Sequence, residues 1–251
     1  MPLRVGHIPG LCYEPFYIDM ERRGVQVVEL PTEGLAAALD EGETDAGPAA
    51  LPDWFRLEDR LGPVAGFCVS ANNRAISGVL CSRIPIEELA GAPIGITEDD
   101  SAWVQLLRVL LTVKYGQAPG PLTSPQESPD ALLLTGNNAL RRRRGVRGYP
   151  HRYDLGQEWR EWTGLPFVFS RWVARKGVAS EDLALLEDTL YVGLEDGVDG
   201  LYHLSEPRDD LLMLAKDVMA YIQGIRYYVG LSEQKSVDLF REYLDQISPT
   251  I

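Results

Sequence analysis

A continuous apolar run in the middle of the chain, residues 165–173, most constrains how this sequence can fold. The run reads LPFVFSRWV, is rich in β-branched and aromatic residues, and stands between two glycine turns, which is typical of a buried strand. Just before it, Leu155 and Trp159 recur at helical spacing and predict a short helix over residues 154–162. We predict that the chain crosses here between two lobes.

The length and composition of the chain are those of a globular protein. Its 251 residues are 45% hydrophobic, enough for one large α/β domain or two lobes of ordinary size. The net charge of −13 argues against nucleic acid or an anionic membrane as a partner, since both need a basic surface. We find no apolar targeting segment and no window near the ~20 apolar residues of a membrane span. We therefore expect a cytoplasmic protein with a small-molecule partner.

The residues that most often bind metals or form disulfides lie without pattern. Cys12, Cys68 and Cys81 are odd in number and lack metal-ligand spacing, which argues against a disulfide framework or a zinc site. The three histidines share no spacing that would build a metal site or a catalytic triad. We expect reduced thiols, no metal and no cofactor.

Strands alternate with helices early in the chain, and helices dominate late, which indicates an α/β fold. The helix that carries Val104 and Leu107 is expected to be capped by Asp100 or Ser101. Gly136 and the two asparagines after it are expected to form a turn. Strands are predicted at residues 3–8, 25–30, 64–70, 75–82, 93–97 and 131–135, and late helices at residues 180–196, 209–228 and 232–247.

Short blocks of sequence spread over the chain form a further pattern. They are GHI at residues 6–8, PFY at 15–17, ISGVL at 76–80, YDLG at 153–156, IRYY at 225–228 and, most specific, TGLPFVF at 163–169 followed by Trp172. Together they resemble the family of chorismate dehydratases of the futalosine route to menaquinone.

The resemblance implies a fold as well as an activity. The implied fold is α/β and two-lobed, of the type II periplasmic-binding-protein kind, with a ligand cleft between the lobes and two crossing segments. Residues 1–80 would form the first lobe and residues 81–167 the second. The helix-rich residues 168–251 would complete the first lobe, so both ends of the chain would lie in the same lobe.

The implied activity is that of a lyase, a dehydratase that removes water from chorismate or a close analogue to give an enolpyruvyl-benzoate for menaquinone. Because loss of water makes the ring aromatic, such a site needs to supply orientation and anion stabilisation rather than a metal or a triad. Matched residue by residue, the family pattern gives Cys12, Ser77 and Asn137 as catalytic candidates and Pro9, Gly10, Leu11, Ser101, Ala102, Trp103 and Gly136 as substrate-binding candidates.

Several of these positions depart from the family pattern, which keeps two functions open. Cys12 stands where the family has Asn, Ala102 and Trp103 or a shifted Ser101 stand for Thr-Ser, and Asn137 stands for Asp. The chain could be a dehydratase for chorismate or an amino-substituted chorismate, or a non-catalytic cytoplasmic protein that binds or senses a small carboxylate. From the residues alone, Cys12 also fits a small buried hydrophobe and Ser77 a core hydroxyl.

The one basic run of this acidic chain covers residues 141–144, with Arg147 close behind. Such a run is typical of a solvated loop. It could also form a lip that attracts an anion towards the cleft, since it follows the expected turn at Gly136.

Overall fold

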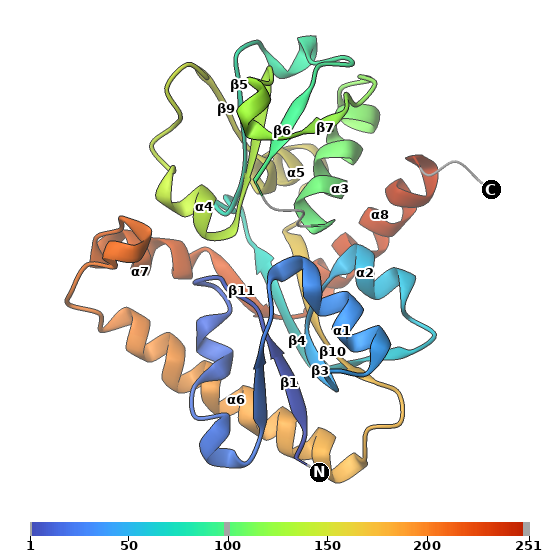
Figure 1. Ribbon diagram of the computed structural model, residues 1–251, viewed down its shortest axis with the longest axis vertical. Coiled ribbons are helices and arrows are strands. Elements are labelled where there is room, and N and C mark those ends of the chain that lie inside the picture. Colours follow the sequence, from blue (N-terminus) through green and yellow to red (C-terminus); the bar gives the residue numbers. More distant parts are fainter. Residues whose placement is uncertain (1, 98–100, 248–251) are drawn as a thin grey trace.

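Two separate β-sheets organise the computed structural model, which describes residues 2–97 and 101–247. The first sheet has six strands in the order β11-β4-β10-β3-β1-β2, and the second has five in the order β7-β6-β8-β5-β9. Each sheet is the centre of one lobe, the first at the bottom and the second at the top of Figure 1. The predicted α/β class and the two lobes are confirmed.

The mid-chain apolar run lies at the centre of the first sheet, as strand β10. It pairs antiparallel with β3 on one side and β4 on the other, while β1 pairs parallel with β2 and β3. Helices α1 (Leu35–Glu41) and α2 (Leu51–Arg56) pack against β3. The strands of this sheet are β1 (Arg4–His7), β2 (Gln26–Glu29), β3 (Ala46–Ala50), β4 (Leu61–Ala71), β10 (Phe167–Arg175) and β11 (Ile225–Tyr228).

The second lobe is built from the middle of the chain. Its strands are β5 (Gly78–Ser82), β6 (Ile94–Ile96), β7 (Leu122–Thr123), β8 (Ala131–Thr135) and β9 (His151–Asp154), and its helices are α3 (Ser101–Val109), α4 (Gly136–Arg141) and α5 (Leu155–Thr163). Helix α5 packs against β5 and β9. The short helical turns among the described residues are η1 (Glu14–Tyr17), η2 (Glu21–Arg23), η3 (Thr32–Gly34), η4 (Ile86–Glu88), η5 (Leu110–Lys114), η6 (Pro125–Glu127) and η7 (Asp209–Leu211).

Two short segments carry the chain between the sheets. Residues 72–77 lead from the end of β4 to β5, and residues 164–166 lead from α5 back to β10. Residues 78–80, which the expected division placed in the first lobe, pair with β8 and β9 in the second sheet. Residue 167, expected in the second lobe, begins β10 in the first sheet. The boundaries therefore fall at the two linking segments.

A single buried carboxylate fixes the first of these segments. Asp154, which is 5% exposed, accepts hydrogen bonds from the backbone N–H of Ala75 at 2.9 Å and of Ile76 at 2.8 Å. The same side chain caps α5 by accepting from the N–H of Gln157. Ile76 has a φ of +57°, a left-handed backbone that a β-branched residue rarely adopts. Asp154 thus holds residues 75–76 of the linking segment in a backbone conformation that isoleucine does not favour.

The C-terminal part is less helical than its period predicts. Helices α6 (Ser180–Tyr202), α7 (Ala215–Gln223) and α8 (Leu231–Ile247) are present. The helix expected over residues 209–228 is wrong before Ala215, where residues 209–211 form the separate turn η7, and again at its end. There Ile225–Tyr228 forms β11, which pairs with β4 at the sheet edge. Its β-branched and aromatic residues suit a strand. The turn expected at Gly136 is instead the first turn of α4.

Helix α8 connects the two lobes through a cluster of aromatic side chains. Phe240 of α8 packs edge-on against Phe167 of β10, with ring centroids 5.1 Å apart, and against Trp159 of α5 at 5.9 Å. The indole N–H of Trp159 donates to the hydroxyl of Ser236 at 3.0 Å. Helix α8 therefore packs against both β10 and the helices of the second lobe.

We expect Asp154→Ala to destabilise the fold by about 3 kcal/mol, because it removes a helix cap and leaves two backbone N–H groups without their acceptor. Denaturant unfolding would measure this loss. Asp154→Asn keeps one acceptor oxygen and should cost less than the alanine variant. A loss below about 1 kcal/mol for the alanine variant would show that the crossing does not depend on this carboxylate.

Candidate functional site

A small cavity of about 20 Å³ lies between the lobes, and it brings together most of the predicted site residues. The first lobe contributes the loop after β1 and residues of β10 and α7, whereas the second contributes α3 and α4. Ser77 comes from the crossing segment. The lining residues are Pro9, Gly10, Leu11, Cys12, Tyr13, Thr32, Ser77, Trp103, Gly136, Asn137, Leu140, Phe169 and Tyr221.

The loop after β1 forms one wall and reaches across to the second lobe. The backbone N–H of Leu11 donates to Oδ1 of Asn137 at 3.2 Å. Gly10 has a φ of +152°, and a side chain there would meet the ring of Tyr13 at 2.8 Å, so the turn requires glycine. Cys12, 4% exposed, lies at the cavity. The loop and α4 are thus tied together at the cleft.

The opposite wall uses some of its polar groups internally. The hydroxyl of Ser77 donates to the carbonyl of Ala75 at 3.2 Å. The carbonyl of Ser77 in turn accepts from the N–H of Gly136 at 2.8 Å. Gly136 therefore lines the cavity without offering its N–H to a ligand, unlike the open helix start that anion binding uses.

Trp103 of α3 fills the space between the lobes. Its ring centroid lies 5.0 Å from that of Phe169 and 5.4 Å from that of Phe167, both on β10. On its other side it rests on Gly78, where an added Cβ would come within 2.3 Å of the indole. The side chain is 2% exposed. The second lobe thus inserts an aromatic ring against the central strand of the first.

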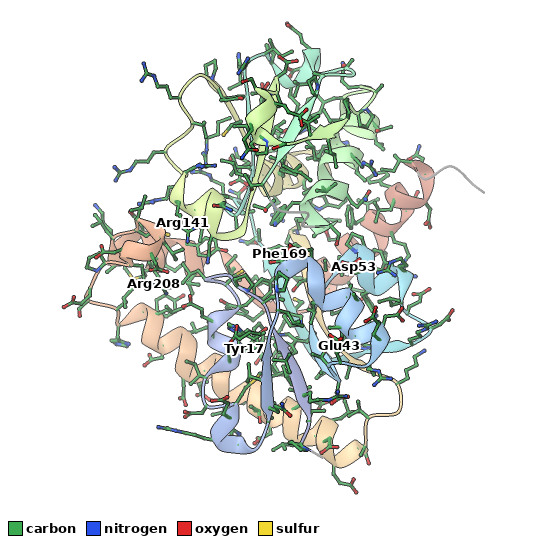
Figure 2. The ribbon with its side chains drawn as sticks, in the orientation of Figure 1. Tyr17, Glu43, Asp53, Arg141, Phe169 and Arg208 are labelled. Atoms are coloured by element: carbon green, nitrogen blue, oxygen red, sulfur yellow. The ribbon has the colours of Figure 1, made fainter. Side chains whose placement is uncertain are left out.

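Two predicted site residues lie elsewhere. Ser101 donates its hydroxyl to Asp53 of α2 at 2.7 Å and lines a separate hollow beside α2 and α8; Figure 2 labels Asp53. Ala102 is 2% exposed but does not line the cavity. Both point away because the helix start faces α2, while Trp103 faces the cleft. Asp100, the other expected cap of this helix, lies outside the described residues.

Five lining residues were not predicted from the sequence. Thr32 begins the 3-10 turn η3, and Leu140 belongs to α4. The positions of these two elements bring both residues to the cavity. Phe169, labelled in Figure 2 where the two lobes meet, lies inside the most specific sequence block. Tyr221 belongs to α7, far along the chain. The helical periodicity of that segment does not predict that Tyr221 lies at the cleft. The five are Tyr13, Thr32, Leu140, Phe169 and Tyr221.

The size of the cavity limits what it holds in this arrangement. A volume of about 20 Å³ is that of roughly one water molecule. Pockets for small molecules usually measure on the order of 300 Å³ or more. A ring-sized ligand therefore requires the lobes to separate or Trp103 to move.

The basic run after the cleft joins the lobes at one edge of the molecule. Arg143 forms an ion pair with Asp217 of α7 at 2.7 Å, and Arg141 donates to the backbone carbonyl of Asp210 at 2.7 Å. Figure 2 shows Arg141 above Arg208 on this edge. Arg141 and Arg143 therefore contact the first lobe, whereas Arg142 and Arg144 are exposed, as expected of a solvated segment, and none of the four lines the cavity.

Arg208 extends this network to the cleft loop. Its guanidinium binds Glu14 through two hydrogen bonds of 2.8 and 2.9 Å and Asp210 through two of 2.9 Å. The bond to Glu14, followed by the one to Asp210, raises the pKa of Arg208, and Arg208 lowers the pKa of Asp210. Since Glu14 directly follows the loop after β1, these contacts hold the start of η1 against the segment before α7, within the first lobe.

The described residues contain no group of three His, Cys, Asp or Glu placed to hold a metal ion. All three cysteines are buried thiols. Burial raises the pKa of Cys68 to about 12 and also raises that of Cys81. Within the part of the chain that the structure describes, no helix combines the length and apolar character needed to cross a membrane.

Solved structures with the same arrangement of lobes define the class of the fold. A protein of Archaeoglobus fulgidus matches with a TM-score of 0.71 at 16% identity, over 98% of this chain and 97% of the other. The periplasmic aliphatic sulphonate binding protein of Escherichia coli matches with a TM-score of 0.60 at 15% identity, over 99% of this chain and 89% of the other. A Candida albicans protein described as having the generic periplasmic binding protein fold matches with a TM-score of 0.60 at 10% identity, over 100% of this chain and 92% of the other.

The fold is therefore that of a two-lobed, periplasmic-binding-protein-like protein, as predicted. A family model for menaquinone biosynthesis matches residues 3–246. The chain belongs to this menaquinone biosynthesis family, which confirms the family recognised from the sequence blocks.

We expect Arg143→Gln to lower the free energy of unfolding at neutral pH by about 1 kcal/mol, the worth of a good partly buried ion pair. The hydrogen bond from Arg143 lowers the pKa of Asp217, so the pair stabilises the protein above the ordinary pKa of an aspartate. That contribution should disappear as the pH falls through the lowered pKa. Urea unfolding at neutral and at acidic pH would measure both effects.

Arg144→Gln is the matched control for this experiment, since Arg144 is exposed and forms no ion pair with the described residues. It should leave stability unchanged at both pH values. An equal loss in the two variants, or a loss for Arg143→Gln that does not shrink in acid, would argue against a stabilising contact between the lobes.

Proposed function

We propose that this protein is a dehydratase that removes water from chorismate or a close analogue, such as an amino-substituted chorismate, and yields an enolpyruvyl-benzoate. The observation that carries the proposal is the cavity between the lobes. In a chain of the menaquinone biosynthesis family, it gathers Cys12, Ser77 and Asn137 from three distant parts of the sequence. Action in the cytoplasm, without a cofactor, is part of the same proposal.

The reaction asks little of the protein beyond placement. A ring C–H bond and the bond from the ring to the hydroxyl group break. The hydrogen and the hydroxyl leave as one water, the enolpyruvyl group stays attached, and the ring becomes aromatic. A closed cleft holds the two carboxylates in place and stabilises charge that develops as the proton leaves. Since none of the described residues that line the cavity carries a charge, neutral donors would do this work.

Each candidate residue would have a distinct part. Asn137 would offer its amide to the substrate once the lobes separate and its oxygen leaves the N–H of Leu11. Ser77 would offer its hydroxyl from the crossing segment. Cys12 would stand beside the reacting ring, in the place of the family's Asn. Pro9, Gly10, Leu11, Trp103 and Gly136 would shape the pocket, whereas Ser101 and Ala102 lie outside the cavity and are dropped from the substrate-binding set.

Substrate entry requires the cleft to open, because about 20 Å³ does not admit a ring. Two-lobed proteins open and close around a few linking residues that absorb changes in backbone angles. The residues 72–77, with Ile76 at a φ of +57°, and residues 164–166, with Gly164 at +74°, are placed to act in this way. Opening would draw Trp103 off the central strand of the first lobe.

One observation favours the second candidate function, a non-catalytic protein that binds or senses a small carboxylate. Trp103 fills the space between the lobes, and Cys12 offers a weaker hydrogen-bonding group than an Asn. A binding protein with such a cleft would take a smaller ligand than chorismate and leave it unchanged.

The test is direct turnover. Purified protein with neither metal nor nucleotide added should convert chorismate to a product lighter by one water, followed by mass spectrometry. Cys12→Asn should raise the rate, because losing one well-placed donor costs ~10²–10³ in rate and this change restores the family's group. Cys68→Ala, at a buried thiol outside the cavity, should leave the rate unchanged.

The dehydratase proposal fails if neither the natural protein nor Cys12→Asn consumes chorismate or its amino analogue. A small carboxylate that binds in a calorimetric titration and is recovered unchanged would then support the binding protein.

A further inference from the structure

Tyr221 of α7 is a cavity residue whose buried hydroxyl has no hydrogen-bond partner among the described residues. The side chain is 2% exposed and lines the cavity between the lobes. Its oxygen is buried and meets hydrogen-bond geometry with no group among the described residues. Most buried polar groups are hydrogen-bonded, so an orphaned hydroxyl at a ligand cavity needs an explanation.

The surroundings of this hydroxyl keep it protonated, so it can donate a hydrogen bond. Cys12 and Ser77, which line the same cavity, lie close enough to influence it. Burial above all, and then the nearness of Cys12, raise the pKa of Tyr221 well above its ordinary value. The phenol therefore keeps its hydrogen at physiological pH. Ser77 already donates to the carbonyl of Ala75.

We infer that Tyr221 binds the substrate by donating its phenolic hydrogen to a carboxylate oxygen held in the cleft. The inference rests on the proposed function of the cleft and adds a contact that the family pattern did not supply. A substrate oxygen in the cavity would supply the acceptor that the buried hydroxyl lacks among the described residues, in place of the single water that the closed cavity has room for. A carboxylate fits because no charged side chain among the described lining residues competes for it, and neutral donors can hold it.

The position of Tyr221 also couples binding to closure of the cleft. Tyr221 belongs to the first lobe and Asn137 to the second, and both line the cavity. A carboxylate substrate that accepts hydrogen bonds from both would bridge the lobes. The ligand would therefore stabilise the closed arrangement through its own oxygens.

The variant Tyr221→Phe tests this contact, since it removes one oxygen and keeps the ring. We expect calorimetric titration with chorismate to show roughly tenfold to hundredfold weaker binding than in the natural protein. The midpoint of thermal unfolding without ligand should stay the same or rise, because an unpaired buried hydroxyl has been removed. A packing role alone would not move affinity in this way.

Tyr227→Phe is the matched control. The Tyr227 hydroxyl is likewise buried without a partner among the described residues, and its pKa is likewise raised by burial. Its ring, however, lines a groove of about 510 Å³ between α6 and β11 and not the cavity. The affinity of the Tyr227→Phe variant for chorismate should equal that of the natural protein.

Benzoate, a plain aromatic carboxylate, serves as a second probe and separates the inference from the proposed function. If the natural protein binds benzoate but not chorismate, and Tyr221→Phe loses that binding, the inference stands and the proposed substrate is wrong. If chorismate binds equally well to the natural protein and to Tyr221→Phe, the inference is wrong and the proposed function survives. An equal loss in Tyr227→Phe, or no binding of either probe, would overturn the inference.

Discussion

The packing of Trp103 between the two lobes is the contact on which the rest of the arrangement depends. Its indole rests on Gly78 in the second sheet and faces Phe167 and Phe169 in the central strand of the first. A residue of any other size at position 78 would push the ring away, because an added Cβ would lie 2.3 Å from it. The same ring that holds the lobes together therefore also takes up the space of the cleft.

Two other sets of contacts hold the lobes in this closed arrangement. Asp154 fixes the first linking segment by accepting hydrogen bonds from the backbone N–H groups of Ala75 and Ile76. At the far edge, the ion pair of Arg143 with Asp217 and the hydrogen bond from Arg141 to the backbone carbonyl of Asp210 hold α4 and the turn after it against the first lobe. Exposed and half-buried ion pairs contribute little each, so a ligand with modest affinity could shift the equilibrium between open and closed forms.

The sequence predicted what depends on local period and on the family blocks. The run at residues 165–173 forms most of the central strand β10, because an apolar, β-branched segment between two turns is stable only where both of its faces are buried. The loop after β1 and Asn137, both named from the family pattern, lie in contact in the structure. Ser101 could not be placed, because residues two apart on a helix lie on nearly opposite sides of it, and Ser101 faces Asp53 while Trp103 faces the cleft. The strand Ile225–Tyr228 and the contact of Tyr221 with the cleft depend on tertiary packing, which period alone does not reveal.

The most direct test of this account is a crystal structure of the protein grown with chorismate. The account predicts the ligand between the lobes, beside Cys12 and Asn137, with the ring of Trp103 moved off Gly78 to make room. Chorismate bound elsewhere, such as in the groove between α6 and β11, with Trp103 still resting on Gly78, would contradict it.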